Sequence, residues 1–400
     1  MDRKADVKPR GRLARRVLGV LVGAAGALGL APASLLVLVG ETRAGRLSGG
    51  VAAGGLLMAA CLGHILFRAP SRAWPWWAGV GLGLLLAVGL AIALVREDPR
   101  PRPARESGLL SRFRDGSEVP KLSPFHLVPE IDQVKLGLTM ITRPVPWVAR
   151  ARTIREVTMG LYREIEADPE ARGLAPVTHF GAMELLGAGF DSGHYFAYAP
   201  EPRDGETLGL VVFLHGNGGN FQALSWAWKD FAEEHRMILL APTFGFGFWG
   251  EGGVEAVDRA SEDARNRWPI DPRRVYLAGH SDGGVGVTRS GAAHPDRYRG
   301  LIYLSPTMHL DELAAPGFIE GWKGRPIRVF QGDRDWSVYK STVDPAVELL
   351  RRSGARVEYD VFPGEDHFLF FSRRSELFDR LGTWMAGIER PEAVEKAGEP

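Results

Sequence analysis

The sequence predicts a doubly wound, mostly parallel α/β sheet preceded by about three transmembrane helices. Two observations support this prediction. The first hundred residues contain three long stretches without charged residues, and the region after about residue 176 alternates short runs rich in Val, Ile and Leu with amphipathic stretches. Apolar runs without polar alternation are typical of strands buried on both faces, and strand–helix alternation is typical of a sheet covered by helices on both sides.

Three N-terminal stretches, 17–40, 49–67 and 74–95, have the length and composition of membrane spans. A helix of about 20 apolar residues crosses a hydrocarbon core about 30 Å thick. Arg16 precedes the first stretch, and Trp74 begins the third, where an aromatic ring is expected at the level of the lipid headgroups. We therefore expect a multi-pass membrane protein in contact with the lipid bilayer.

The topology of this region has two alternatives. Ala31-Pro32-Ala33 resembles the cleavage site of a signal peptide, but the two later stretches favour a retained membrane region. Seven Lys or Arg residues lie before Val17 and favour the cytoplasm for the N-terminus. Three spans then place the rest of the chain on the extracytoplasmic side. A cluster of arginines after residue 95 favours the opposite orientation.

Composition shifts divide the chain into a membrane region (1–96), a proline-rich connector with an amphipathic surface helix (97–175), an α/β domain (176–390) and a tail (391–400). The α/β domain contains seven predicted strands: Gly193–Tyr198, Leu208–Leu214, Met237–Ala241, Arg274–Ala278, Gly300–Leu304, Ile327–Gln331 and Val357–Phe362. The net charge of +1 gives no reason to expect nucleic acid as a partner, and a single cysteine excludes an intrachain disulfide.

A G-x-S-x-G motif at 279–283 follows a predicted strand and opens a helical stretch. In that context the serine, here Ser281, lies on a tight strained turn, with the positive end of the helix dipole beside it. Strand, turn and helix together favour a catalytic nucleophile over a chance match.

A serine nucleophile needs a base within hydrogen-bond distance and an acid that orients the base. His367 follows the last predicted strand and is the expected base; His294 ends the helix after the nucleophile, and His309 is a weaker rival. Asp335 is the expected acid because it lies deeper in its loop than Asp333, which remains the alternative. Asp366 is expected to shape the loop of the base.

Acyl transfer also needs donors for the oxyanion, each contributing roughly 3–4 kcal/mol when well placed. The glycine-rich loop His215-Gly216-Asn217-Gly218-Gly219 follows a strand, so the backbone amides of Asn217 and Asp282 are the expected donors. The loop lacks the lysine and Ser/Thr spacing of a phosphate-binding P-loop.

From about Val177 to the end, the chain resembles the α/β-hydrolase superfamily. The residues that support the resemblance, in order, are His215 to Gly219, Gly279 to Gly283, Gly332 to Asp335, and His367. The chain is most similar to the branch with carboxylesterases, polyhydroxyalkanoate-depolymerase-like esterases and prolyl-oligopeptidase-type catalytic domains, for which Ile270 to Val275 is also characteristic. The resemblance does not extend to the membrane region.

The resemblance implies a serine hydrolase that cleaves a small-molecule ester or a short peptide, without cofactor or metal. Its rivals are a serine peptidase of prolyl-oligopeptidase type and a non-catalytic hydrolase-like domain in a membrane complex. The expected substrate pocket consists of five residues: His215, Phe244, Phe246, Trp249 and Trp336. Ordinary loop packing is the alternative for these aromatic residues.

Overall fold

The computed structural model describes residues 9–68, 73–97, 106–114, 128–142, 151–171, 191–245 and 247–389. The chain forms two compact units. The N-terminal unit contains Met1–Arg100 and Leu127–Arg155, and the sheet unit contains Pro101–His126 and Glu156–Pro400. The segment 97–175, predicted as a connector, therefore contributes residues to both units.

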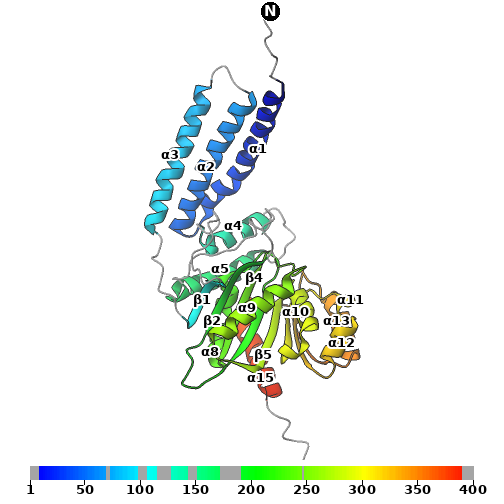
Figure 1. Cartoon of the computed structure of the whole chain (residues 1–400). Coiled ribbons are helices and arrows are strands. Elements are labelled where there is room, and N and C mark those ends of the chain that lie inside the picture. The colour runs from blue at the N-terminus through cyan, green and yellow to red at the C-terminus, as the bar shows by residue number, and fades with distance from the viewer. Residues whose placement is uncertain are drawn as a thin grey trace, which may run out of the picture. The chain divides into compact units, whose positions relative to one another are not determined.

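Three long helices dominate the N-terminal unit: α1 (Pro9–Val39), α2 (Arg43–Arg68) and α3 (Trp74–Glu97) (Figure 1). All three are long and apolar enough to cross a membrane, as the sequence predicts. Glycine residues allow the backbones of neighbouring helices to approach each other closely. A Cβ atom at Gly63 of α2 would lie 2.3 Å from the backbone nitrogen of Gly23 in α1, and one at Gly54 would lie 2.8 Å from the carbonyl oxygen of Gly83 in α3.

A fourth helix, α4 (Glu130–Thr142), belongs to the same unit and binds the turn between α1 and α2. The buried carboxylate of Asp132 accepts hydrogen bonds from the backbone amides of Glu41 (2.5 Å) and Thr42 (3.2 Å) and from the Thr42 hydroxyl (2.5 Å). This helix lies in the predicted connector and was not predicted from the sequence. Acidic residues in its first turn favour a helix start directly after Pro129.

The sheet unit contains one eight-stranded sheet in the order β1-β2-β4-β3-β5-β6-β7-β8. Its strands are β1 (Gly108–Phe113), β2 (Asp191–Ala199), β3 (Leu208–Leu214), β4 (Met237–Phe244), β5 (Ile270–His280), β6 (Gly300–Leu304), β7 (Pro326–Gly332) and β8 (Arg356–Phe362). Strand β2 runs antiparallel to both of its neighbours, and the pairs from β4 to β8 are parallel. The predicted fold class, a mostly parallel α/β sheet covered by helices, is confirmed.

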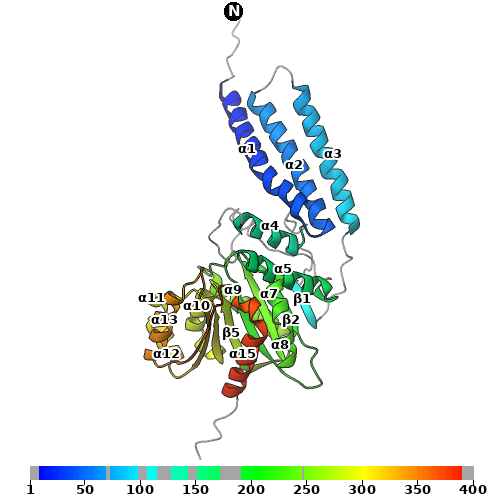
Figure 2. The ribbon, with the colours of Figure 1, turned by 180° about the vertical axis from the view of Figure 1, so that it is seen from behind.

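Helices cover both faces of this sheet (Figures 1 and 2). In chain order they are α5 (Ala151–Ala167), α7 (Gln222–Ala227), α8 (Lys229–Glu234), α9 (Gly253–Arg267), α10 (Gly283–Ala293), α11 (Leu310–Leu313), α12 (Pro316–Trp322), α13 (Lys340–Arg352), α14 (Leu369–Ser372) and α15 (Arg374–Glu389). Helices α9 and α10 pack on one face, and α8 and α15 contact each other on the other face through the stacked rings of Phe231 and Phe378.

The central strands are buried along their whole length. Every residue of β3 and β4 is buried, which accounts for their uninterrupted apolar sequences. Parallel strands place their carboxyl ends at one edge of the sheet. The loops that follow β3, β4, β5, β6, β7 and β8 therefore meet at that edge, and they contain the polar residues singled out from the sequence.

Candidate active site

Ser281 lies on a strained turn between β5 and α10. Its φ is +55°, a left-handed conformation that side chains other than glycine rarely adopt. The backbone fixes this turn, because the amide of Ser281 donates to Leu304 (3.0 Å) and its carbonyl oxygen accepts from Thr307 (2.8 Å). A side chain at either flanking glycine would clash: a Cβ at Gly279 would lie 2.4 Å from the carbonyl oxygen of Gly283. The G-x-S-x-G spacing is thus a steric requirement of the turn.

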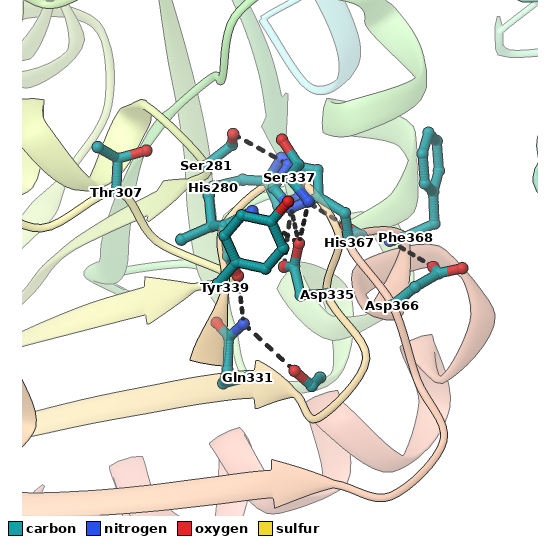
Figure 3. A network of polar contacts seen from close by, with 12 residues as sticks. His280, Ser281, Thr307, Gln331, Asp335, Ser337, Tyr339, Asp366, His367 and Phe368 are labelled. Carbon is teal, nitrogen blue, oxygen red and sulfur yellow. Dashed lines mark hydrogen bonds and ion pairs between the residues drawn. The ribbon is translucent and has the colours of Figure 1, made fainter. Parts of the chain in front are cut away.

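His367, in the loop after β8, reaches the nucleophile position. Its Nε2 atom lies 3.0 Å from the Oγ atom of Ser281, and both side chains are buried (Figure 3). With a proton on Nδ1, the ring accepts the Ser281 hydroxyl proton through Nε2. The rival histidines bind other partners: His294 contacts Asp258 at 2.8 Å, and His309 lies 3.6 Å from Glu312.

Asp335, in the loop after β7, holds the other side of the His367 ring. Its Oδ2 and Oδ1 atoms lie 2.8 and 3.1 Å from Nδ1 of His367, and Oδ1 also accepts from the backbone amides of Ser337 and Val338. Burial acts to raise the pKa of Asp335, but the His367 hydrogen bond and charge and these two amides outweigh it and hold the pKa below its ordinary value. The carboxylate therefore stays ionised beside the ring.

The competing aspartates have structural roles in the two loops. Asp333 is exposed and accepts a hydrogen bond from the backbone amide of Gly364 at 2.6 Å. Asp366 accepts from the backbone amide of Phe368 at 3.0 Å (Figure 3). The structure therefore brings Asp335, and not Asp333, to His367.

His280, directly before Ser281, contacts His367 and was not singled out from the sequence. Its ring lies against His367, with a centroid distance of 5.1 Å, and its Nε2–H donates to the His367 carbonyl oxygen at 3.3 Å. Burial, together with the neighbouring His367 ring, lowers the pKa of His280 to about 3. A neutral ring therefore supports the loop that contains His367.

The expected oxyanion donors lie in the two loops that meet at Ser281. The loop after β3 contacts the nucleophile closely, since a Cβ at Gly216 would lie 2.8 Å from the Cβ of Ser281. Asp282 is the N-cap of α10, so its amide lies at the positive end of that helix. Among the described residues, no acceptor is found for the backbone amide of Asn217 or Asp282.

The structure corrects part of the predicted substrate pocket. The side chains of His215, Phe244 and Trp249 are all at least 98% buried, behind the loop after β3 instead of lining a pocket. The Nε1–H of Trp249 donates to the carbonyl oxygen of His215 at 2.8 Å, and the backbone amide of Phe244 donates to Nε2 of His215 at 3.1 Å. Burial lowers the pKa of His215 to about 4, so this ring is a neutral structural element.

Of the predicted pocket residues, Trp336 lies beside the site. Trp336 is 44% exposed, and its ring meets the His367 ring edge-on at a centroid distance of 6.1 Å. Phe248, which was not predicted to line the pocket, is 57% exposed, unlike its buried neighbour Trp249. Phe246, also predicted to line the pocket, lies outside the described residues.

A buried chain of polar side chains supports the loop after β3 from behind. Ser111 of β1 contacts His194 of β2 at 3.0 Å, and His194 contacts Thr243 of β4 at 2.9 Å. Asn220 then donates to Thr243 (2.9 Å) and to the carbonyl oxygen of Ala241 (2.8 Å). These hydrogen bonds connect β1 to the glycine-rich loop. The sequence shows only that Asn220 directly follows the glycine-rich loop, and it gives no sign of the contacts among Ser111, His194 and Thr243.

In the described ranges, no cluster of three or more His, Cys, Asp or Glu residues is arranged to hold a metal ion. No protein-family model matches the sequence, and no curated protein matches it.

Solved structures similar to this chain include several esterases and serine hydrolases. A thermostable esterase is 22% identical, with a TM-score of 0.37; the match covers 50% of this chain, which spans only 57% of that chain. The esterase Est1E from Butyrivibrio proteoclasticus is 17% identical, with a TM-score of 0.40, over 50% of this chain and 98% of that chain. Fluorophosphonate-binding serine hydrolase F of Staphylococcus aureus is 15% identical, with a TM-score of 0.41, over 49% and 92%.

Proposed function

We propose that this chain is a membrane-anchored serine hydrolase that cleaves carboxylic esters through an acyl-enzyme. The observation that supports the proposal most directly is the hydrogen-bonded series of Ser281, His367 and Asp335, with distances of 3.0 Å and 2.8 Å. Three side chains from three separate loops meet in the order that nucleophilic catalysis requires. Structural packing alone gives no reason for a strained serine to face a histidine that a buried carboxylate orients.

In the proposed mechanism, Oγ of Ser281 attacks the ester carbonyl carbon while Nε2 of His367 takes the hydroxyl proton. The tetrahedral oxyanion is held by the amides of Asn217 and Asp282. His367 then gives its proton to the leaving alkoxide, and the C–O ester bond breaks to leave an acyl-serine. Water, deprotonated by His367, attacks this acyl group, and the proton returns to Ser281 as the acid is released.

Asp335 fixes the proton of His367 on Nδ1 and stabilises the imidazolium that forms in each half-reaction. Its pKa lies below the ordinary value, so it remains a carboxylate while the ring carries charge. An ester is favoured over a peptide because the sequence marks no peptide-specific pocket, such as an acidic patch for the N-terminal amine.

The membrane anchor is the second part of the proposal. The helical segments Leu13–Val39, Arg43–Arg68 and Trp74–Ala93 each have the length and composition of a span. The basic N-terminal tail favours a cytoplasmic N-terminus, so the sheet unit would be extracytoplasmic.

The test uses the purified full chain in detergent micelles. We expect a fluorophosphonate probe to label the wild type, Ser281→Ala to lose labelling and ester hydrolysis, and Ser341→Ala, an exposed serine in α13, to retain both. Acyl esters of varied chain length and aminoacyl-arylamides are then compared as substrates. Cleavage of the arylamides alone would identify a peptidase, and a folded wild-type protein that resists labelling would refute a catalytic role.

A further inference from the structure

The loop after β6 packs against the nucleophile turn, although the mechanism proposed above gives it no step. Ser305, which begins this loop, has a φ of +44°, and its amide donates to the carbonyl oxygen of Phe330 at 2.8 Å. The chain then reaches the start of α10, where a Cβ at Gly284 would lie 2.6 Å from the carbonyl oxygen of Thr307. The close contact of the two backbones therefore requires a glycine at 284.

Thr307 binds two successive residues of the nucleophile turn. Its backbone amide donates to the carbonyl oxygen of Ser281 at 2.8 Å, and its hydroxyl donates to Oδ1 of Asp282 at 2.7 Å. Thr307 lies beside Ser281 in Figure 3. Every residue except proline can supply the backbone bond. The hydroxyl bond to Asp282 is therefore the contribution that is specific to this side chain.

The carboxylate of Asp282 does not cap α10, although Asp282 is the N-cap residue. An aspartate at this position ordinarily accepts a hydrogen bond from an amide in the first helical turn. Here Asp282 has helical φ and ψ of −61° and −16° and makes no side-chain cap hydrogen bond. The amide of Gly284 donates instead to the carbonyl oxygen of Ser281 at 2.9 Å. The amide of Val285 donates to the carbonyl oxygen of Asp282 at 3.0 Å. The Thr307 hydroxyl, and not the helix end, thus holds this carboxylate.

The position of this negative charge matters for the proposed reaction. The backbone amide of Asp282 is an expected oxyanion donor, and it lies at the positive end of α10. That helix end attracts any anion, including the carboxylate of the same residue. A carboxylate that moved there would compete with the oxyanion for its donors, and its charge would repel the oxyanion.

We propose that Thr307 is a positioning residue that holds the carboxylate of Asp282 away from the oxyanion position. The inference rests on the proposed esterase function, and Thr307 acts through Asp282 and not on the substrate. The oxyanion exists only in the tetrahedral species. The contact therefore lowers the barrier to reaction without strengthening substrate binding, and its loss should lower kcat and leave KM nearly unchanged.

The first test removes the hydroxyl. Thr307→Val replaces it with a methyl group of similar size and keeps the backbone amide. We expect kcat for ester hydrolysis to fall by about tenfold, which corresponds to a carboxylate released to within about 6 Å of the oxyanion at an effective dielectric constant of about 40. Thr307→Ser keeps the hydroxyl and should restore the rate. Thr383→Val, which removes an exposed threonine hydroxyl bond in α15, is the matched control.

A double-mutant cycle separates the effect of the charge from a purely structural effect. Thr307→Val is measured again in the Asp282→Asn background, in which the side chain keeps its shape but carries no charge. There the additional change in kcat should stay within about twofold, which is the usual scatter of independent substitutions. Equal losses in the two backgrounds would mean that Thr307 only holds the loop and would overturn the proposal. An unchanged kcat in Thr307→Val alone would overturn it as well.

All variants are compared as full chains in detergent micelles, with the unfolding temperature measured in parallel. If Thr307→Val does not fold, Thr307→Ala removes the same hydroxyl without a branched side chain and completes the same cycle. The proposed function has its own test. A folded wild type that fluorophosphonate does not label refutes both the esterase and the role of Thr307. A labelled wild type with equal losses in the cycle overturns the role of Thr307 alone.

Discussion

Replacing Asp335 with asparagine tests the proposed triad at its most specific point. In the structure, Oδ1 of Asp335 accepts the amides of Ser337 (2.9 Å) and Val338 (2.8 Å), whereas Oδ2 lies nearest Nδ1 of His367 at 2.8 Å. In Asp335→Asn, the two amides keep the side-chain oxygen at the Oδ1 position. The new NH₂ group therefore takes the place of Oδ2 and faces Nδ1.

This exchange reverses the tautomer of His367 without removing the loop's hydrogen bonds. The NH₂ group donates to Nδ1, so the ring proton moves to Nε2, which then points an N–H at Ser281 instead of a lone pair. A triad histidine held in the wrong tautomer lowers kcat by about 10⁴-fold, which corresponds to about 5.5 kcal/mol of transition-state stabilisation. Because the loop amides remain paired, the unfolding temperature should change little.

The assay compares kcat for ester hydrolysis and the rate of fluorophosphonate labelling in the full chain, with thermal unfolding measured in parallel. Asp333→Asn is the matched control, because its side-chain oxygen can still accept the amide of Gly364, and its rate should stay close to that of the wild type. The reasoning is refuted if Asp335→Asn remains within about tenfold of the wild-type rate, far short of the loss expected for a triad acid, or if Asp333→Asn loses as much activity.

Three further changes test the supporting structure. Gly216→Ala places a Cβ 2.8 Å from the Cβ of Ser281 and should lower kcat/KM by about 10²–10³-fold by displacing the oxyanion loop, whereas Gly317→Ala, which meets no atom within 4 Å, should leave it unchanged. Trp249→Phe leaves the His215 carbonyl without its indole donor and should destabilise the sheet unit by about 1–3 kcal/mol in denaturant unfolding, with an unchanged midpoint arguing against that bond. Burial lowers the pKa of His280 to about 3, so the unfolded chain binds a proton there that the folded chain does not. As pH drops from about 6.5 toward 4, His280 alone should lower stability by about 1.4 kcal/mol per pH unit, beside a similar contribution from His215. His280→Asn should flatten this slope in urea titrations near pH 7 and pH 5, and an unchanged slope would contradict the buried neutral ring.

Strands that are buried on both faces were predictable, because burial imposes a continuous apolar sequence. All seven predicted strands are present, from β2 to β8. Strand β1 was missed, since its six residues include Ser111 and Arg112 and lie in a proline-rich stretch. Its burial depends on pairing with β2, about 80 residues away in the chain. Local sequence carries no signal for such a pairing.

The positions of the proposed triad were predictable because each follows a strand at a defined offset. The turn at Ser281 requires small neighbouring residues, and the sequence places a glycine on each side of it, at 279 and 283. The choice between Asp333 and Asp335 was harder, since both lie in the same loop. The structure distinguishes them by direction: Asp333 turns to the amide of Gly364, and Asp335 turns to His367.

Side-chain direction in loops explains why the pocket prediction was only partly useful. Phe248 and Trp249 are adjacent, yet Phe248 is 57% exposed and Trp249 is buried. Trp249 has φ of +47°, a conformation that turns its ring inward to stack on Phe244 at 5.3 Å. A loop has no periodic pattern that predicts which side chains point outward. The aromatic composition of this loop therefore could not distinguish residues that line a pocket from residues that pack in the interior.

The polar chain behind the glycine-rich loop shows where the sheet unit begins. Ser111 of β1 satisfies one ring nitrogen of the buried His194, and Thr243, which also binds Asn220, satisfies the other. A domain that began at residue 176 would lack β1, so the buried His194 would lose its contact with Ser111 and the edge of β2 would be open. Since a typical intramolecular hydrogen bond contributes about 0.5–1.5 kcal/mol, β1 stabilises the polar contacts that support the loop with the proposed oxyanion donor. Strand β1 thus belongs to the structural support of the proposed active site.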